Sequence, residues 1–529
     1  MDLFGATSRT GLSRRSVLFL AAVGFATAFL VSTGEPGLDT KHRLQVAHSL
    51  FTGEPPVPEN ERAYFGVVGR GGTVHAWFGI GQSLVMLPAD LVATKATASL
   101  RGPVRERARL ALVMLTTFPV LSALILVAAA ALLVSLGFDE RESVLGALGL
   151  QFATTLLPYT QVTQENSLLL LALLLGYAGH LRWASTGRLA HAVLGSLALG
   201  FALLIRIPTV LDIAAVAACA LMASSSCGVL AGGQPNRGAQ LGRYLLVSAS
   251  IYAVFLAIDR WYQWIRFGTV FSTYQHLWAQ QLRATRPDLP ANFPFSTPLS
   301  VGAWGALFSP ERSVFLFEPL LVLTPLLLIL LRGRISRPVQ AVVGTATLLL
   351  GGYVCFYGRW FDWSGASSWG DRFLTGPTEL IALIAIALLA RHGRELSRLL
   401  AALSIAVLAL AVFIQLESLA FWYLLEETQH AQGLGTRFTV VQRAINIAAL
   451  VSTRFRAWGL DPGGPAAELR PNFFFWKLRE YLPPTSWSAT AAAWACGVLV
   501  LSFAVAAKVR ALSRQASPPR TRETALPSS

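Results

Sequence analysis

Residues 16–53 read SVLFLAAVGFATAFLVSTGEPGLDTKHRLQVAHSLFTG, an apolar run followed by a polar stretch that carries Asp39. The run 16–33 is long enough to cross a bilayer as a helix, because about 20 apolar residues span the hydrocarbon core. Asp39 therefore falls just beyond the first crossing, where the membrane meets water. A carboxylate at that level, followed by a long polar and aromatic loop, predicts chemistry at the membrane surface and fits a pore lining poorly.

The whole chain has the composition of a membrane protein. Of its 529 residues, 54% are hydrophobic and 13% are charged, and the mean hydropathy is +0.53, whereas a soluble domain carries about 25% charged residues. We predict an all-α fold, a polytopic transmembrane bundle of about twelve helices with juxtamembrane helices in the first extracytoplasmic loop. The net charge of +15 is attributed to arginines that set topology and contact anionic lipid, so no nucleic-acid partner is expected.

Apolar runs and basic connections alternate along the chain. The runs lie near 16–33, 108–136, 143–159, 166–181, 189–205, 208–224, 243–259, 316–332, 338–356, 375–391, 397–417 and 487–508. With a cytoplasmic N-terminus, nearly every short inside connection is basic, as the positive-inside rule requires. The alternative for the first run, a secretion signal with Arg14 and Arg15, is less consistent with the many spans that follow.

Four long segments then fall on the outer side: 34–107, 260–315, 357–374 and 418–486. They are rich in aromatic residues, Pro and Gly, and we predict surface-lying helices over 76–92 and 438–451. The resulting division has a catalytic membrane core over 1–417, which includes the loop 34–107. It is followed by an extracytoplasmic segment 418–486, a last membrane helix 487–508 and a disordered cytoplasmic tail 509–529.

Ionisable residues at the ends of the spans are the candidate functional groups. Asp39 and Glu165 fall at the same face, so one could act as a general base while the other orients the acceptor or a divalent metal. No metal is assigned, and the need for one stays open. The structural alternatives are a helix cap or a surface pair with Lys41 or Arg43 for Asp39, and a helix N-terminal acid for Glu165.

Basic residues at the same face suit a phosphate. Arg372 is the first candidate, because its planar guanidinium can bind two phosphate oxygens at once; the alternative is a pair with Asp371. Arg206 could hold an anionic substrate or pair with Asp212. His75, which precedes the predicted surface helix, is the third candidate for binding the phosphate; the alternative is an ordinary surface residue, which a lone histidine there more often is.

Several enzyme motifs are absent from the sequence. It contains no GxxxxGK[ST], HExxH, GxSxG or paired acidic DxD element. Nucleotide hydrolysis is therefore not indicated. The spans also leave no room for a cytoplasmic domain that could bind a soluble nucleotide-sugar, so we do not expect such a compound as a substrate.

The order of several short motifs resembles the GT-C superfamily of polytopic glycosyltransferases, near the aminoarabinose transferases of lipid A and the protein O-mannosyltransferases. The stretches that carry the resemblance are LDTKHRLQVAHSLFTG (38–53), VHAWFGIGQSLVMLPADLVA (74–93), QENSLLLLALLL (164–175), LALGFALLIRIPTVL (197–211) and WFDWSGASSWGDRFLTGPTELI (360–381). Each is weak alone, and together they cover most of the chain.

The resemblance implies a glycosyltransferase of the bacterial cytoplasmic (inner) membrane whose active site faces the periplasm. It implies transfer, with inversion, of a sugar from a polyprenyl phosphate to a hydroxyl of a glycan, lipid or protein. Asp39 matches the catalytic base, Glu165 the second acid and Arg372 a phosphate-facing residue. The chain departs from the aminoarabinose transferases at His75-Ala76, where those enzymes carry Lys-Pro. A transporter or lipid flippase, or a non-catalytic scaffold, remains the competing interpretation.

Overall fold

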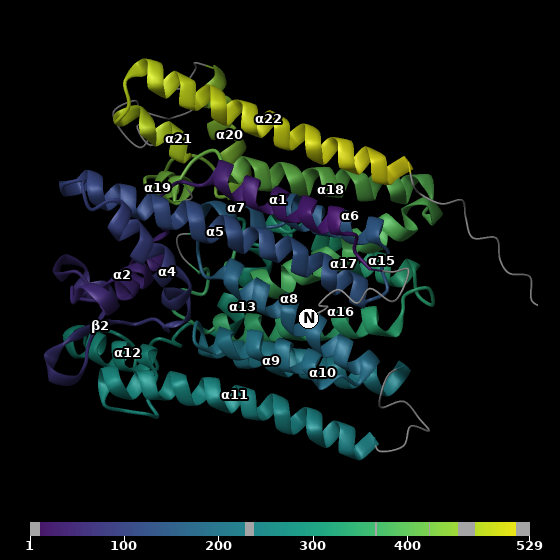
Figure 1. Ribbon diagram of the computed structural model, residues 1–529, viewed down its shortest axis with the longest axis horizontal. Helices are drawn as coiled ribbons and strands as arrows, with labels where there is room; N and C mark the ends of the chain where they lie inside the picture. Colours follow the sequence, from purple (N-terminus) through teal and green to yellow (C-terminus); the bar gives the residue numbers. More distant parts are fainter. Residues whose placement is uncertain (1–10, 228–236, 366–367, 423, 453–470, 515–529) are drawn as a thin grey trace, which may run out of the picture.

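The protein is a bundle of long helices that run side by side (Figure 1). The computed structural model describes residues 11–227, 237–365, 368–422, 424–452 and 471–514. Within these ranges, nine helices are long and apolar enough to cross a membrane. They are α1 (Arg14–Val31), α5 (Gly102–Ser135), α8 (Asn166–Thr186), α10 (Val210–Cys227), α11 (Arg237–Phe267), α16 (Arg337–Tyr357), α17 (Thr375–His392), α18 (Arg398–Ser418) and α22 (Pro484–Arg514). The predicted all-α fold class is confirmed.

The centre of the bundle is closely packed, whereas its rim is apolar and open. In the centre, α8 packs against α9 (Leu189–Leu203) so tightly that a Cβ on Gly179 would come within 2.6 Å of the His191 carbonyl oxygen. Small residues permit such close helix contacts in membranes. At the rim, Leu246 of α11 and Phe503 of α22 are 69% and 73% exposed. Large apolar side chains in such positions fit contact with lipid better than contact with water.

Three of the twelve predicted spans form shorter or interrupted helices. The run 143–159 divides into α6 (Glu140–Ala153) and α7 (Leu156–Val162), because Thr154 has an extended backbone. The run 316–332 divides at Pro319 into α14 (Val314–Phe317) and α15 (Leu320–Leu330). The run 189–205 forms α9, which at 15 residues is shorter than the nine spanning helices. Hydropathy alone does not report such breaks.

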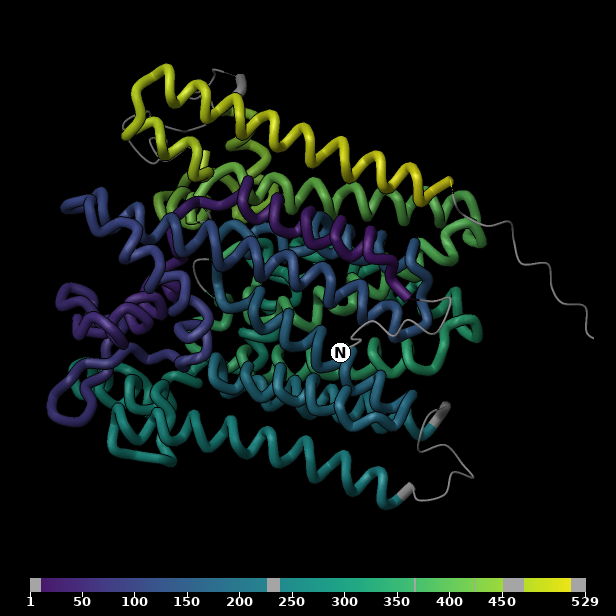
Figure 2. The backbone as a smooth tube through the Cα atoms, in the orientation of Figure 1, coloured from purple at the N-terminus to yellow at the C-terminus, as the bar shows by residue number. Residues whose placement is uncertain are grey.

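The four segments predicted to lie outside gather at one end of the bundle, on the left of Figures 1 and 2. The first contains α2 (Leu38–Thr52), α3 (Arg62–Phe65), a two-stranded antiparallel sheet of β1 (Gly66–Val68) and β2 (Val74–Ala76), and α4 (Gly81–Ala96). The others contain α12 (Tyr274–Thr285), α13 (Leu299–Phe308), α19 (Leu425–Ala431), α20 (Thr439–Ser452) and α21 (Phe474–Lys477). The helix expected over 76–92 is α4 and begins later, at Gly81, because Val74–Ala76 pairs as a strand.

At its C-terminal end α22 continues to Arg514, so that 509–514 are helical. The rest of the predicted tail, 515–529, lies outside the described residues, as do 453–470 of the predicted extracytoplasmic segment. The helix expected over 438–451 is α20.

Candidate functional site

A cavity of about 760 Å³ lies at the end of the bundle that carries the long loops. Its lining comes from segments far apart in the sequence: α2, the start of α8, the turn after α9, α12, the loop 291–295 and the loop after α16. Five of the lining residues form one charged cluster, which consists of Asp39, Arg43, Glu165, Arg206 and Arg372. The cavity therefore contains four of the five residues that the sequence predicted for the site.

Asp39 forms an ion pair with a residue that is far from it in the sequence. It lies in the first turn of α2, and Arg372 Nη1 donates to its Oδ2 at 2.7 Å. The two side chains are 15% and 14% exposed. The cap of α2 is Gly37, not Asp39, and Gly37 donates its N–H to the Val162 carbonyl oxygen. A Cβ on Gly37 would approach that oxygen to 2.7 Å, so glycine allows this close approach.

The structural alternatives for Asp39 are not found in the structure. Lys41 pairs with Glu61 at 2.7 Å, and Arg43 pairs with Glu165 at 2.8 Å. Asp39 Oδ1 accepts no hydrogen bond from the residues that the structure describes. One carboxylate oxygen is thus fixed, while the other is left available at the cavity.

Glu165 is a carboxylate surrounded by the arginines of the cluster. Arg43 Nη1 donates to its Oε2, and Arg206 Nη1 lies 3.9 Å from its Oε1. Burial opposes ionisation of this carboxyl, but Arg43, Arg372 and Arg206 outweigh burial and hold the pKa of Glu165 well below its ordinary value. Glu165 is the N-cap residue of α8, yet its side chain makes no capping hydrogen bond. The carboxylate therefore pairs with arginines and does not cap the helix.

Arg206, one of the two predicted phosphate-binding arginines, lies on aromatic rings. The guanidinium of Arg206 lies 5.0 Å from the ring centre of Tyr357 and 5.1 Å from that of Phe373, and it donates to the Tyr357 hydroxyl. It does not pair with Asp212, which accepts from the Tyr353 hydroxyl at 2.8 Å.

Arg372 retains an unused donor. Its Nε is buried and has no hydrogen-bond partner in the described structure. Burial disfavours the charged form, but Asp39 and Glu165 outweigh it and raise the pKa of Arg372 above its ordinary value. Asp371 does not pair with it and instead accepts the Phe373 N–H at 3.0 Å. Arg372 is therefore a fixed cation with capacity for another acceptor.

His75 lies apart from the cluster. It sits in β2, its ring meets Phe267 edge-on at 5.6 Å, and it does not line the cavity. Burial and the neighbouring Arg266 lower the pKa of His75 to about 4, so it is neutral at pH 7. A role for His75 in phosphate binding stays a prediction without support from its position.

Arg43 is the residue that the sequence analysis missed as a site residue. It appeared there only as a local partner for Asp39. Positions 39 and 43 are one helical turn apart, so both side chains project from one face of α2. That spacing could have identified Arg43 as a site residue from the sequence. Its pairing with Glu165, 122 residues away, required the tertiary structure.

The donor set does not fit a divalent metal. Four arginines line the cavity, Arg43, Arg206, Arg283 and Arg372, against three carboxylates, Asp39, Glu165 and Asp362. Both Asp39 and Glu165 already pair with arginines, and the described residues contain no group of three or more His, Cys, Asp or Glu that could hold a metal. Oxygen-rich, negatively charged sites are those that suit Mg²⁺ or Ca²⁺. The excess of positive charge suits an anion instead.

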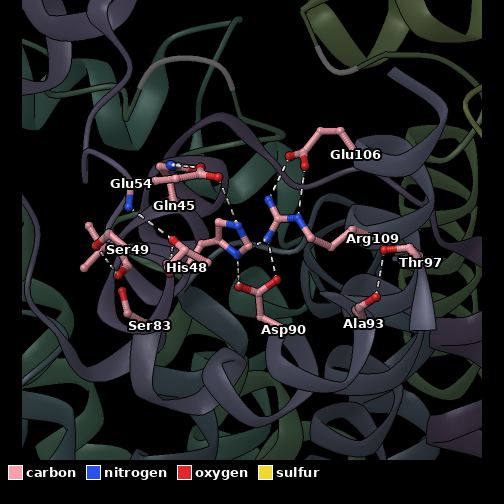
Figure 3. A network of polar contacts seen from close by, with 12 residues as sticks. Gln45, His48, Ser49, Glu54, Ser83, Asp90, Ala93, Thr97, Glu106 and Arg109 are labelled. Carbon is pink, nitrogen blue, oxygen red and sulfur yellow. Dashed lines mark hydrogen bonds and ion pairs between the residues drawn. The ribbon is translucent and has the colours of Figure 1, made fainter. Parts of the chain in front are cut away.

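A second buried network fixes α2 to the membrane bundle (Figure 3). His48 Nδ1 lies 2.9 Å from Asp90 Oδ2 on α4, and Asp90 also accepts from Arg109 on α5. Arg109 further donates to both carboxylate oxygens of Glu106. Nearer the site, Ser83 on α4 donates to the Arg43 carbonyl oxygen at 2.7 Å. The helix that carries Asp39 and Arg43 is thus tied to α4 at two levels.

Part of the cavity lining is apolar and is exposed at the outer surface of the bundle. It is formed by Val210, Phe295, Phe356, Trp360 and Phe361. Val210, Phe356 and Phe361 are 54%, 36% and 42% exposed. The cavity therefore offers a ligand both arginines and apolar side chains that are exposed at the outer surface of the bundle.

Comparisons with known proteins are sparse. No family model and no curated protein matches the sequence. Among solved structures, the archaeal oligosaccharyltransferase AglB from Archaeoglobus fulgidus, in complex with an inhibitory peptide and a dolichol-phosphate, is similar with a TM-score of 0.45 and 11% identity. The match covers 76% of this chain and 56% of AglB, so the chain spans little more than half the length of that protein. A likeness at this level assigns neither a family nor an activity.

Proposed function

We propose that the protein is a membrane glycosyltransferase that moves a sugar from a polyprenyl phosphate to an acceptor hydroxyl, with inversion at the anomeric carbon. The observation that carries the proposal is the joint placement of Asp39, Glu165, Arg43, Arg206 and Arg372 in one cavity with an apolar side wall. Such a cavity suits a ligand that is anionic in the middle and apolar at one end.

The donor phosphate is assigned to Arg372 and Arg206. Arg372 has an unused Nε donor, and Arg206 is held on two aromatic rings at the same wall. Guanidinium groups bind phosphate oxygens through paired N–H donors. The polyprenyl chain would leave along Val210, Phe356 and Phe361, which connect the cavity with the outer surface of the bundle.

Asp39 is assigned as the general base. Its free Oδ1 accepts the proton of the acceptor hydroxyl while that oxygen bonds to the anomeric carbon. The bond between the anomeric carbon and the phosphate oxygen breaks, and the electron pair leaves with the lipid phosphate. The arginines stabilise this leaving group, so no separate general acid is needed.

Glu165 is assigned a different task. It is paired with Arg43 and lies 3.9 Å from Arg206, so it remains ionised and cannot readily accept a proton. Its charge offsets part of the repulsion among the three arginines and keeps them in place when no phosphate is bound. Asp39 is thus assigned to proton transfer and Glu165 to charge balance.

The test begins with the donor. Mass spectrometry of lipid-linked sugars and envelope glycans, from cells with and without the gene, identifies which lipid-linked sugar accumulates in its absence. Transfer from that lipid is then measured with the purified protein in liposomes. Asp39→Asn should reduce turnover by a factor of about 10²–10⁴, the usual contribution of a positioned base.

The matched control is Asp288→Asn, which removes an exposed carboxylate from the loop that follows α12. It should leave turnover unchanged. Full turnover by a normally folded Asp39→Asn protein would exclude Asp39 as the base, and no change in any lipid-linked sugar on loss of the gene would contradict the proposed donor class.

Transport or lipid flipping is the second candidate, and one observation favours it. Glu318 and Glu379 are buried within the bundle at 2% and 1% exposure. The Thr155 N–H donates to Glu318, and the Thr155 hydroxyl lies within hydrogen-bonding distance of both carboxyls. Buried carboxyls among membrane helices often mark ion pathways. Movement of a fluorescent polyprenyl phosphate across the liposome membrane, abolished by Glu379→Gln and unaffected by Asp39→Asn, would favour this candidate over sugar transfer.

A further inference from the structure

A second cavity, of about 860 Å³, opens at the same end of the bundle. We propose that it binds the phosphate headgroup of an anionic phospholipid in the leaflet at that face. The two cationic groups assigned to this headgroup are Arg107, at the start of α5, and Arg479, between α21 and α22. The site is independent of sugar transfer, and its failure would leave the proposed function untouched.

The second cavity lies across a short connector from the first. Residues Thr33, Gly34 and Glu35 line the second cavity, whereas Leu38 and Asp39 line the first. Phe474 seals the connector from the other side, because its N–H donates to the Ser32 carbonyl oxygen at 2.8 Å and its ring covers Gly34. The two cavities are thus separate compartments that share one wall.

Both guanidinium groups are held on aromatic rings and remain available to an anion. Arg107 lies 5.3 Å from the ring centre of Tyr481, and Arg479 lies 5.8 Å and 5.5 Å from those of Trp476 and Trp487. Stacking uses the faces of the guanidinium and leaves its N–H edges free. Neither arginine makes an ion pair with any described residue, whereas Lys477 in the same cavity is already paired with Glu35 at 2.6 Å.

The position and the wall of the cavity indicate a lipid rather than a soluble anion. The membrane-spanning helices α5 and α22 both begin here, so the cavity lies at the level where spanning helices reach water. Its α5 wall consists of Val104, Ala108 and Ala111, and Val104 is 51% exposed. Tryptophan, tyrosine and arginine side chains are favoured at headgroup depth, and basic pockets between membrane helices bind anionic headgroups. An apolar wall beside two free cations fits an acyl chain next to its phosphate.

The test measures lipid binding by the full-length protein in detergent, by native mass spectrometry. The probes are phosphatidylglycerol, phosphatidylcholine and inorganic phosphate. We expect phosphatidylglycerol to bind well above phosphatidylcholine. The double variant Arg107→Gln/Arg479→Gln should bind it about 30-fold more weakly, since each basic residue near a membrane surface contributes a factor of about five.

The matched control is Arg286→Gln/Arg437→Gln, which removes two exposed arginines outside the cavity. It should bind phosphatidylglycerol as the unmodified protein does. A second variant, Arg107→Lys/Arg479→Lys, keeps both charges and should retain most of the binding, which separates lost contacts from a failure to fold. Equal binding of phosphatidylglycerol by the Gln variant and the unmodified protein would overturn the site. Competition by millimolar inorganic phosphate as effective as that by lipid would overturn the lipid assignment.

Discussion

The pairing of Arg43 with Glu165 gives the sharpest quantitative prediction. Both side chains are nearly inaccessible, at 3% and 4% exposure, with their charged atoms 2.8 Å apart. Arg206 is the next cation, 3.9 Å from Glu165. Arg43→Gln therefore removes the hydrogen-bonded partner of the buried carboxylate and leaves Arg206 at 3.9 Å and the charge of Arg372 farther away.

The expected cost follows from these distances. At an effective dielectric constant of about 20, the Arg43 contact supplies about 6 kcal/mol of attraction and the Arg206 contact about 4 kcal/mol. Loss of one partner from a buried pair usually costs about 3–5 kcal/mol, because it leaves an uncompensated charge. Since Arg206 retains roughly two fifths of the direct attraction, we expect Arg43→Gln to lower the free energy of unfolding by about 3 kcal/mol, at the low end of that range.

The assay is a double-mutant cycle with Arg43→Gln, Glu165→Gln and the combined variant. Unfolding by sodium dodecyl sulfate in mixed micelles is followed through tryptophan fluorescence. The double variant should be less destabilised than the sum of the single variants by about 2 kcal/mol, because the two groups are in direct contact. Arg286→Gln, at an exposed pair with Asp288, should leave the stability essentially unchanged, because solvent screens such a pair. Additive single-variant effects, or an Arg43→Gln cost no larger than the control, would refute the argument.

Two further predictions concern the support of α2. His42 is buried against Phe65, and burial lowers its pKa to about 4. Because the unfolded state then binds more protons than the folded state between pH 6.5 and 4, stability is fully present above pH 6.5 and is lost as the pH falls. From pH 7.5 to 4.5 the loss should be about 2.5 kcal/mol, and His42→Phe should lack this part of the pH dependence in the same unfolding assay; equal slopes would contradict it. Asp90→Asn removes the fully buried carboxylate between His48 and Arg109. It should cost about 2–3 kcal/mol, less than a complete loss of partners, because Glu106 still pairs with Arg109; proteolysis within α2 should accelerate, and unchanged cleavage would show that the network does not hold this helix.

The sequence contained enough information to identify one end of the bundle as the location of the candidate site. Alternation of apolar runs and basic connections predicted that Asp39, Glu165, Arg206 and Arg372 share one face, and the structure places all four in one cavity. That inference depends only on whether an even or an odd number of membrane crossings separates two residues. Errors of a few residues in the helix boundaries do not change this number. Whether this face lies outside the cell stays a prediction of the basic-residue pattern.

The pairing within the cluster could not be predicted from the sequence. The ion-pair partners considered as structural alternatives were neighbours in the sequence, Lys41 or Arg43 for Asp39 and Asp371 for Arg372. The observed pairs join residues 333 positions apart, Arg372 with Asp39, and 122 positions apart, Arg43 with Glu165. Such pairs depend on how separate loops fold over the helix ends, for which a single sequence gives no distance information. The breaks at Thr154 and Pro319 were missed because a hydropathy window averages over them.

In the proposed reaction, the arrangement of the ion pairs determines how many arginines act directly on Asp39. If Asp39 alone balanced the positive charge, all three guanidinium groups would stabilise its ionised form and weaken it as a proton acceptor. Glu165 pairs with two of them, Arg43 and Arg206, so that Asp39 has one direct partner, Arg372. A phosphate that binds the unused Nε of Arg372 would draw positive charge from Asp39 at the moment when the donor is in place. In the proposed reaction, the donor phosphate and Asp39 would therefore share one guanidinium, that of Arg372.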